Sequence, residues 1–329
     1  MPVIVWLRKQ GFVFFLFSAV LLAFLWPEPA SGQEGASVEW TADLAVVLIF
    51  LLQGLSLPTR QMLAGSQPVR LHLFVLGWNF MLFPALAALV NAPFSLWIGA
   101  ELGVGLWMSA ILPTTIASAT ALTAATGGAV PQAIFASIFS NLCGIGIVPL
   151  LAIAYLSNAS GAELSLAPVF VKLCWIVVLP LASGQCLRRL FRRASITVGE
   201  RTRWLPQAAI IYIVYLSFAQ TVASGVLETV PVLRLLGALL AVTALLLMAS
   251  WGVWRSSGWM RLDHAQRTSA FFTASQKSIA TGLPLLTTVF GAASLPLETG
   301  LVLVPLLLYH PLQLLLGGLL LPRLAPGRD

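Results

Sequence analysis

Two stretches of this chain combine residues that could bind an ion or a polar solute inside a membrane. The first, 111–149, reads ILPTTIASATALTAATGGAVPQAIFASIFSNLCGIGIVP, and the second, 273–296, reads TASQKSIATGLPLLTTVFGAASLP. Both are hydrophobic, yet prolines, glycines and hydroxyl residues interrupt them. A membrane tolerates irregular backbone only where it is buried in protein or lines a cavity. Two such interruptions in corresponding halves of a chain point to the binding site of a secondary transporter.

Lys277 is the residue in these stretches that is most costly to bury. A lysine in mid-span costs roughly 2.5–3.5 kcal/mol on insertion scales and is a functional hypothesis by default. The competing interpretation is a side chain that snorkels to the interface. Apolar or small residues separate Lys277 from both loops, which disfavours snorkelling. Gly282 and Pro284 permit a break nearby, and the residues expected to line a site are Thr273, Ser275, Gln276 and Lys277.

In the first stretch, Pro113 removes a backbone donor and disfavours helix just before it. The hydroxyls of Thr114, Thr115 and Ser118 could satisfy the freed backbone groups, or they could line a site near mid-membrane. For Thr114 both interpretations stay open, whereas Thr115 and Ser118 are predicted site residues.

Three further polar positions extend this candidate site. Ser137 and Asn141 lie four residues apart and therefore on one face of the next helix. A buried asparagine is costly unless it is paired, so Asn141 and Asn79 are predicted to be functional. The alternative for Asn79 is a hydrogen bond that only joins helices.

The composition requires a membrane environment for the elements that carry these residues. Of 329 residues, 59% are hydrophobic and only 9% are charged, against about 25% charged in soluble domains. One spanning helix needs roughly 20 apolar residues. We therefore predict a single all-α membrane domain over 1–329 with ten spanning helices, at about 11–26, 43–57, 70–90, 96–126, 130–156, 167–187, 206–227, 232–255, 265–290 and 296–321.

The loop charges predict the orientation of these spans. One group of loops carries basic residues, namely Arg8, Lys9, Arg60, Arg70, a cluster over 188–203, Arg255, Arg261, Arg267, Arg323 and Arg328. The other group carries Glu28, Glu34, Glu39, Glu163, Glu228 and Glu298. Because Lys and Arg mark the cytoplasmic side, both termini are predicted to be cytoplasmic, in a bacterial inner or plasma membrane. The first apolar run also fits a signal peptide, but we favour a helix because its removal would leave an odd number of spans.

Division at the basic cluster gives two halves of five spans each. An odd-numbered half and its copy must insert in opposite orientations, which is the inverted-repeat architecture, with interruptions in spans four and nine. No nucleic-acid-binding segment, metalloprotease motif, hydrolase elbow or phosphate-binding loop is present. Cys143, Cys174 and Cys186 are isolated and signal neither disulfides nor zinc. We expect neither an enzyme nor a cofactor, and we leave monomer and homodimer open.

Two motifs carry a resemblance to a known family. Leu112-Pro113-Thr114-Thr115 followed by Ser118, and Gln276-Lys277-Ser278 followed by Gly282-Leu283-Pro284, resemble the divergent branch of the bile acid:sodium symporter family. That branch includes the seventh member of human solute carrier family ten. The resemblance covers nearly the whole chain, from Gly54 to the last span. It implies a panel part at about 11–57 and 167–227, a core part at about 70–156 and 232–321, and two broken helices that cross.

The resemblance also implies two sodium ions beside the crossing. Asn79 matches a glutamine ligand of the family, and the matched sodium ligands are Ser118, Ser137, Asn141 and Gln276. Three positions depart from the pattern: Ala119 replaces an asparagine, Phe272 replaces the shared glutamate and Lys277 replaces an asparagine.

The predicted function is secondary-active transport of a small organic anion by alternating access. In this hypothesis Lys277 either replaces a sodium ion or releases and binds the coupled proton. The competing hypothesis is a membrane regulator of calcium entry or envelope assembly that does not transport.

Overall fold

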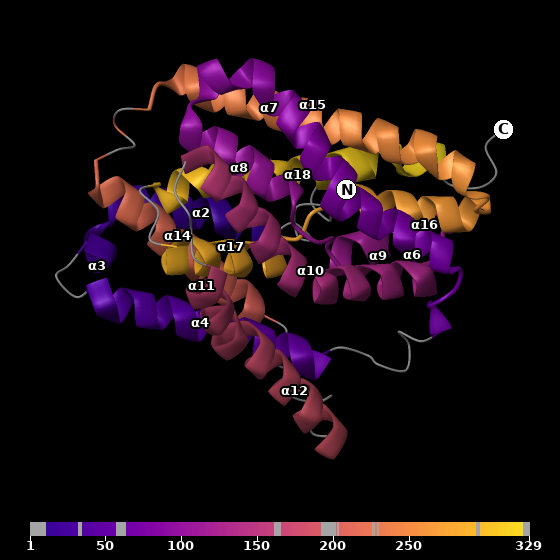
Figure 1. Cartoon of the computed structure of the whole chain (residues 1–329), viewed down its shortest axis with the longest axis horizontal. Helices are drawn as coiled ribbons and strands as arrows, with labels where there is room; N and C mark the ends of the chain where they lie inside the picture. The colour runs from indigo at the N-terminus through magenta and orange to yellow at the C-terminus, as the bar shows by residue number, and fades with distance from the viewer. Residues whose placement is uncertain are drawn as a thin grey trace. The chain divides into compact units, whose positions relative to one another are not determined.

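The computed structural model describes residues 11–31, 35–56, 64–160, 166–191, 204–225, 230–293 and 297–324, together with Thr202 and Glu228. Within these residues all regular secondary structure is helical (Figure 1), which confirms the all-α class. Arg8, Lys9, Arg60 and most of the basic cluster lie outside the described residues. The predicted orientation therefore stays a prediction.

Six described helical stretches are long and apolar enough to cross a membrane: Val69–Ile98, Val130–Ser157, Ala167–Leu190, Leu205–Ala223, Val232–Met260 and Thr299–Leu324. Two shorter apolar helices are Gly11–Leu25 and Trp40–Ser56. The predicted spans at 96–126 and 265–290 are each divided into two helices. Ten spans in two inverted repeats stay a prediction.

The predicted boundary between the third and fourth spans, at 90–96, is wrong. The helix continues through Pro93 to Ile98 and ends at Gly99, whose φ is 81°. A left-handed residue ends a helix readily when it is glycine, because no Cβ opposes that conformation. The backbone conformation at Gly99 therefore sets the boundary.

By its internal contacts the chain divides into two compact units. Unit 1 comprises 1–57, 167–231 and 290–301, and unit 2 comprises 58–166, 232–289 and 302–329. The assignment of panel and core parts from the family resemblance stays a prediction.

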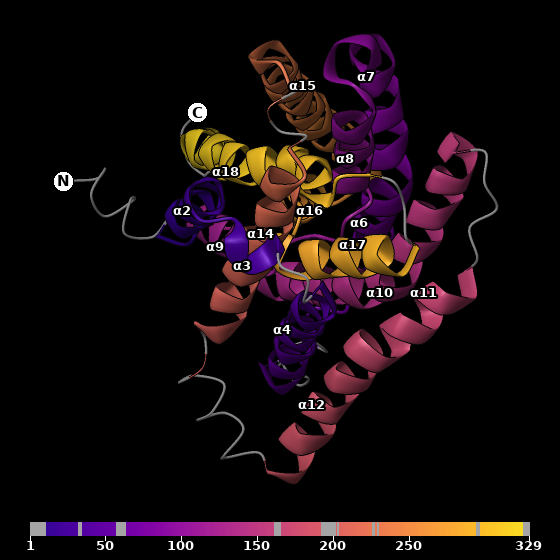
Figure 2. The same cartoon turned by 90° about the vertical axis from the view of Figure 1, so that its left-hand side faces the viewer.

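Unit 1 contains α2 (Gly11–Leu25), α3 (Glu28–Ser31), α4 (Gly35–Ser56), α11 (Leu166–Leu173), the π-helical turn η2 (Cys174–Val178), α12 (Leu179–Leu190) and α14 (Leu205–Ala223). Figure 2 shows α11, η2 and α12 as one continuous rod. Helix α12 packs closely on α4 because Gly54 and Gly184 face each other; a Cβ on either would overlap the main-chain carbonyl of Leu181 or Leu51. Small residues at such contacts let membrane helices approach each other.

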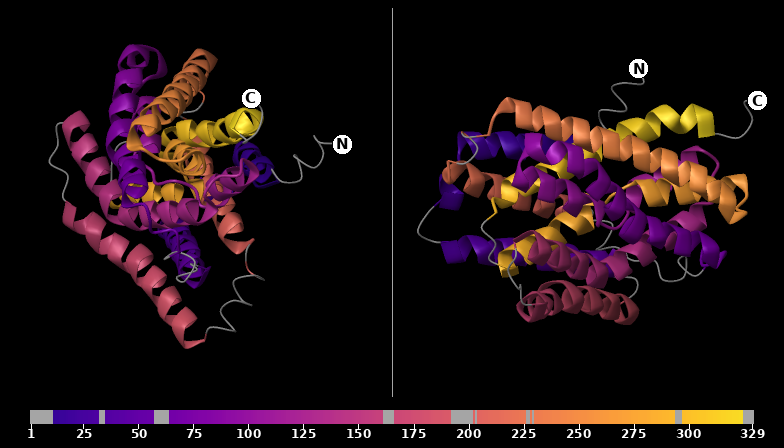
Figure 3. Two further views of the ribbon diagram at one scale, coloured as in Figure 1. Left: turned by 90° about the vertical axis from the view of Figure 1, so that its right-hand side faces the viewer. Right: turned by 45° about the horizontal axis from the view of Figure 1, so that its top comes forward.

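Unit 2 contains α6 (Val69–Gly77), the π-helical turn η1 (Trp78–Leu82), α7 (Phe83–Ile98), α8 (Ala100–Ala110), α9 (Ala117–Ala125), α10 (Val130–Ser160), α15 (Val232–Ser257), η4 (Gly258–Met260), α16 (His264–Ser275), and most of α17 (Ile279–Ala293) and α18 (Thr299–Leu324). Helices α7 and α15 run side by side (Figures 1 and 3). Helix α16 packs against α6, α9, α10 and α15, so its C-terminal end lies inside the unit.

Candidate functional site

Both predicted interruptions are present, and the backbone connects them. Helix α8 ends at Ala110 and α9 begins at Ala117, while α16 ends at Ser275 and α17 begins at Ile279. The Ser278 backbone N–H donates to the Pro113 carbonyl at 2.9 Å. The two interrupted segments are therefore in direct contact inside unit 2.

The second interruption lies earlier in the chain than the helix-breaking residues suggest. Residues 276–278 are non-helical, whereas Gly282 and Pro284 lie within α17. Gln276 is extended, with φ −100° and ψ 146°. The Ser278 hydroxyl oxygen accepts from the Thr281 backbone N–H at 3.2 Å, which is the contact that an N-cap makes. Ser278 therefore starts the new helix.

The Lys277 side chain is completely buried in this contact region, with 0% exposure. Its Nζ donates to the Leu112 carbonyl at 2.9 Å, to the Asn79 carbonyl at 3.2 Å and to Asn79 Oδ1 at 3.4 Å. It also lies 4.2 Å from the centre of the Phe83 ring. Among the described residues no carboxylate forms an ion pair with it. Carbonyl oxygens, including that of Leu112 after the C-terminal end of α8, accept from Nζ instead.

The Asn79 carbonyl is available to Lys277 for a local reason. In η1 the Phe83 backbone N–H donates to the Trp78 carbonyl, five residues earlier. The matching partner for the Asn79 carbonyl is the backbone nitrogen of residue 84, which is proline and carries no hydrogen. A π-helical turn followed by Pro84 thus leaves one buried carbonyl without a helical donor, and Lys277 supplies the donor.

The Asn79 amide connects three elements of unit 2. Its Nδ2 donates to Ser140 Oγ on α10 at 3.1 Å and to the Thr273 carbonyl on α16 at 3.4 Å. Ser140 Oγ also accepts from the Thr114 backbone N–H at 3.4 Å. Asn79 therefore joins helices with its amide and binds Lys277 with its oxygens, so both interpretations of this residue have a structural basis.

Ser137 and Asn141 hold the first interrupted segment against α10. Asn141 Nδ2 donates to the Thr114 and Ser137 carbonyls, each at 2.7 Å, and Ser137 Oγ donates to the Thr115 carbonyl at 3.3 Å. Asn141 Oδ1 and Thr114 Oγ1 are buried without a hydrogen-bond partner. Unpaired buried oxygens are uncommon and need an explanation, such as an ordered water or an ion.

Ser118 and Gln276 join the two segments through their side chains. Ser118 Oγ donates to Gln276 Oε1 at 2.7 Å. The hydroxyls of Thr273 and Ser275 instead donate to carbonyls of their own helix, at Ser269 and Phe271, at 2.8 and 2.7 Å. The structure thus places all nine predicted site residues in unit 2, and the hydroxyls of Ser118, Ser137, Thr273 and Ser275 all donate hydrogen bonds within it.

Helix α18 contributes contacts that were not predicted from the sequence. Gln313 contacts both backbone atoms of Lys277: its Oε1 accepts from the Lys277 N–H at 2.7 Å, and its Nε2 donates to the Lys277 carbonyl at 2.9 Å. The Tyr309 hydroxyl donates to the Ser275 carbonyl at 2.7 Å. The spacing of Tyr309 and Gln313, one helical turn apart in an apolar run, is the signal that could have found them.

A recess of about 10 Å³, room for about one water molecule, lies between α15, α16 and α18. It is smaller than the roughly 300–1,000 Å³ of most ligand pockets. No group of His, Cys, Asp or Glu side chains that could hold a metal ion occurs in the described part of the chain. The lining residues of the recess are Leu246, Ser250, Phe271, Phe272, Ser275, Gln276, Gln313, Leu316, Gly317 and Leu320.

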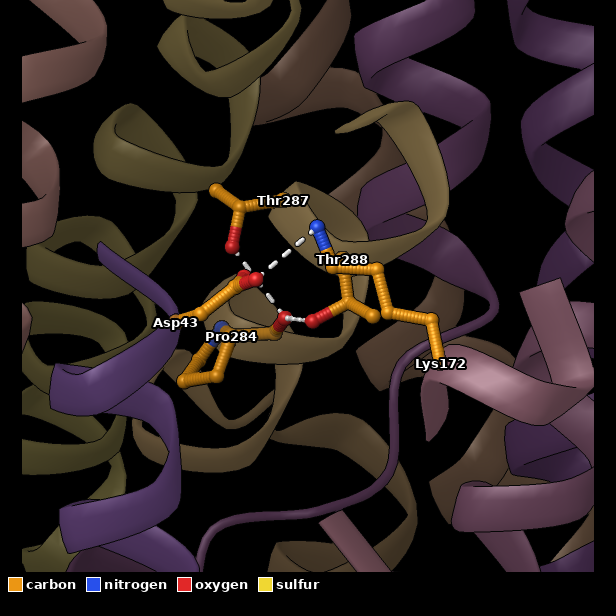
Figure 4. Close-up of polar contacts among 5 residues, drawn as sticks. All are labelled: Asp43, Lys172, Pro284, Thr287 and Thr288. Atoms are coloured by element: carbon orange, nitrogen blue, oxygen red, sulfur yellow. Dashed lines mark hydrogen bonds and ion pairs between the residues drawn. The ribbon is translucent and has the colours of Figure 1, made fainter. Parts of the chain in front are cut away.

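A second lysine, in unit 1, has a different environment. Lys172 on α11 forms an ion pair with Asp43 on α4 at 3.1 Å, and their side chains are 26% and 30% exposed (Figure 4). The same view labels Thr287 and Thr288 of α17, whose hydroxyls donate to the Pro284 carbonyl. Lys172 therefore has the carboxylate partner that Lys277 lacks.

Apolar helices, interrupted spans and a buried polar contact region define a multi-pass integral membrane protein of the transporter class. The model of the SBF-like CPA transporter family matches residues 10–326, so the chain belongs to this family. This match confirms the resemblance to the bile acid:sodium symporter family. Because the family is described as one of transporters, the match is also consistent with the expectation that the chain is not an enzyme.

Relatives match along almost their entire length. An uncharacterized protein of Pseudomonas aeruginosa is 32% identical over 324 residues, which cover 97% of this chain and 94% of that protein. Sodium/bile acid cotransporter 7 of Danio rerio is 31% identical over 332 residues, or 98% of this chain and 95% of that protein. The corresponding protein of Mus musculus is 30% identical over 323 residues, or 96% and 92%.

Proposed function

We propose that this protein is a secondary-active transporter that carries a small organic anion by alternating access, with ten spans in two inverted repeats. The observation that supports the anion is the buried Lys277 side chain, which has no carboxylate partner among the described residues and which we propose carries a positive charge during transport. An uncompensated positive charge inside a membrane protein marks a substrate or ion pathway. The bacterial inner membrane, with both termini cytoplasmic, is part of this proposal.

Helix polarity supports the same sign of substrate charge. Helices α9 and α17 begin directly after the two interruptions, at Ala117 and Ile279. The N-terminal ends of helices carry partial positive charge and favour anions. Lys277 lies against the carbonyls after α8, where negative partial charge favours a cation. In our proposal the Lys277 ammonium takes the place of one sodium ion, and the N-terminal ends of α9 and α17 face the anion.

A coupling cation has candidate ligands at the first interruption. Asn141 Oδ1 and Thr114 Oγ1 are buried oxygens without partners, and oxygen atoms are the ligands that hard cations prefer. We propose that these atoms, with Ser118, Ser137 and Gln276, form the site for one coupling sodium ion. Proton release from Lys277 is the competing version of the coupling step, and it requires no sodium.

The test is uptake by proteoliposomes that contain the full chain, with a panel of radiolabelled organic anions under imposed sodium or proton gradients. We expect gradient-driven uptake of at least one anion, with reduced affinity or altered ion dependence in Lys277→Gln and Lys277→Ala. Lys172→Gln is the matched control, since it removes a lysine that is paired and partly exposed. Unchanged affinity and ion dependence in both Lys277 variants would remove Lys277 from the proposal. Absence of flux for every anion, with a folded protein, would favour the regulator hypothesis.

A further inference from the structure

The peptide groups of Lys277 have lost both of their helical partners. In a continuous helix the Lys277 N–H would donate to the Thr273 carbonyl, which instead accepts from Asn79 Nδ2. The Lys277 carbonyl would accept from the Thr281 N–H, which instead donates to the Ser278 hydroxyl. Unsatisfied backbone groups within a membrane cost several kcal/mol each. The interrupted segment therefore depends on donors and acceptors from elsewhere in the fold.

One side chain supplies both. The Gln313 amide accepts from the Lys277 N–H at 2.7 Å and donates to the Lys277 carbonyl at 2.9 Å, and its side chain is only 2% exposed. A carboxamide is the one uncharged side-chain group with an acceptor and a donor in the geometry of a peptide. Gln313 thus replaces, from α18, the backbone pairing that the interruption removes.

Neighbouring groups on α18 hold the amide in this orientation. His310 Nδ1 lies 2.9 Å from Gln313 Nε2, so the second N–H of the amide points at the imidazole. The Tyr309 hydroxyl donates to the Ser275 carbonyl at 2.7 Å, two residues before Lys277. Helix α18 therefore binds two carbonyls at the end of α16 and just beyond it, Ser275 through Tyr309 and Lys277 through Gln313.

We propose that Gln313 is a positioning residue for Lys277: by fixing both backbone atoms of that residue, it aims the ammonium at the carbonyls of Leu112 and Asn79. From the observed backbone position Nζ lies 2.9 Å from the Leu112 carbonyl and 3.2 Å from the Asn79 carbonyl. The inference rests on the proposed function in taking the Lys277 ammonium as part of the transport site. It also requires α18 and the second interruption to move together during transport.

The first experiment measures hydrogen–deuterium exchange of the purified full-length protein in nanodiscs, in overlapping peptides across 274–284. Gln313→Met keeps the side-chain length but removes the amide, and we expect exchange at the Lys277 N–H to accelerate about tenfold, as loss of one buried acceptor predicts. Gln185→Met is the matched control, because Gln185 Nε2 donates to the Gly54 carbonyl at 2.7 Å in unit 1. Gln313→Glu keeps an acceptor oxygen and should retain most of the protection, which provides a second variant if Gln313→Met does not fold. Unchanged protection at Lys277 in Gln313→Met, or its loss in a folded Gln313→Glu, would overturn the proposal.

The second experiment separates positioning from general stability. In a double-mutant cycle of thermal unfolding with Gln313→Met and Lys277→Met, we expect the combined loss in Tm to be smaller than the sum of the single losses. Gln185→Met with Lys277→Met should be additive, because the Gln185 amide donates to the Gly54 carbonyl, whereas the Lys277 backbone N–H donates to Gln313. Additivity in the Gln313 cycle would show that the amide only stabilises the fold. Neither readout uses a substrate, so absence of transport would refute the proposed function while these results still decide the role of Gln313.

Discussion

Replacement of Lys277 by methionine should separate the function of the buried ammonium from its contribution to stability. Methionine has nearly the same length but no donor, so two carbonyls that now lie 2.9 and 3.2 Å from Nζ would lose their partner. Each unsatisfied buried acceptor costs about 1–3 kcal/mol. Against this, the variant no longer buries a charge, which cost about 2.5–3.5 kcal/mol. The two carbonyls together cost about 2–6 kcal/mol, so the two effects partly cancel, and we expect the free energy of unfolding to fall by no more than about 3.5 kcal/mol.

The folded variant should also transport with lower affinity. A hydrogen bond to a charged group contributes about 1.5–3 kcal/mol, so loss of the ammonium should weaken anion binding about tenfold to a hundredfold. Uptake in proteoliposomes gives the apparent affinity, and the intrinsic fluorescence of the 11 tryptophans reports thermal unfolding.

Lys172→Met is the control for this prediction, because it removes a lysine whose charge is balanced by Asp43. It should leave the apparent anion affinity within about twofold of wild type. If Lys277→Met folds and transports with unchanged affinity, the reasoning that connects the buried charge to the substrate is refuted. If the control variant loses affinity equally, the effect is not specific to the interrupted segments.

Three further predictions concern single contacts. Pro84→Ala provides a backbone N–H for the Asn79 carbonyl, five residues earlier. The variant should leave the melting temperature unchanged or raise it. It should nevertheless weaken anion uptake severalfold, because the new donor competes with Lys277 for that carbonyl. Thr114→Val removes a buried hydroxyl without a partner, so it should raise the free energy of unfolding by about 1 kcal/mol; an unchanged sodium dependence of uptake would exclude this oxygen as an ion ligand. Gly54→Ala and Gly184→Ala should each destabilise by about 1–3 kcal/mol in thermal unfolding, and the double variant by less than the sum, since both disrupt one helix contact. Gly146→Ala is the control and should be neutral, because nothing lies close to the added methyl group. If all three alanine variants were equally destabilised, close packing of α4 on α12 would not explain the loss.

The candidate site was predictable where a local rule applies. Pro113 cannot donate a backbone hydrogen bond, and the first interruption is found around it. The second interruption was placed less well, because Gly282 and Pro284 are accommodated within α17 while Gln276 adopts the extended backbone. The π-helical turn before Pro84 carried no recognisable signal, since hydropathy does not distinguish it from an α-helix.

The sequence by itself determined the membrane environment, the helical class, the polar residues that interrupt two spans and the presence of a lysine too costly to bury without a role. These properties depend on composition and on neighbours a few residues away. The tertiary structure alone decided what surrounds that lysine. Its ammonium binds carbonyls 165 and 198 residues distant in sequence, and its peptide is held by an amide 36 residues away. These partners depend on how the helices pack against one another. The periodicity of side chains within one helix does not show which carbonyl of a neighbouring helix lacks a hydrogen-bond donor.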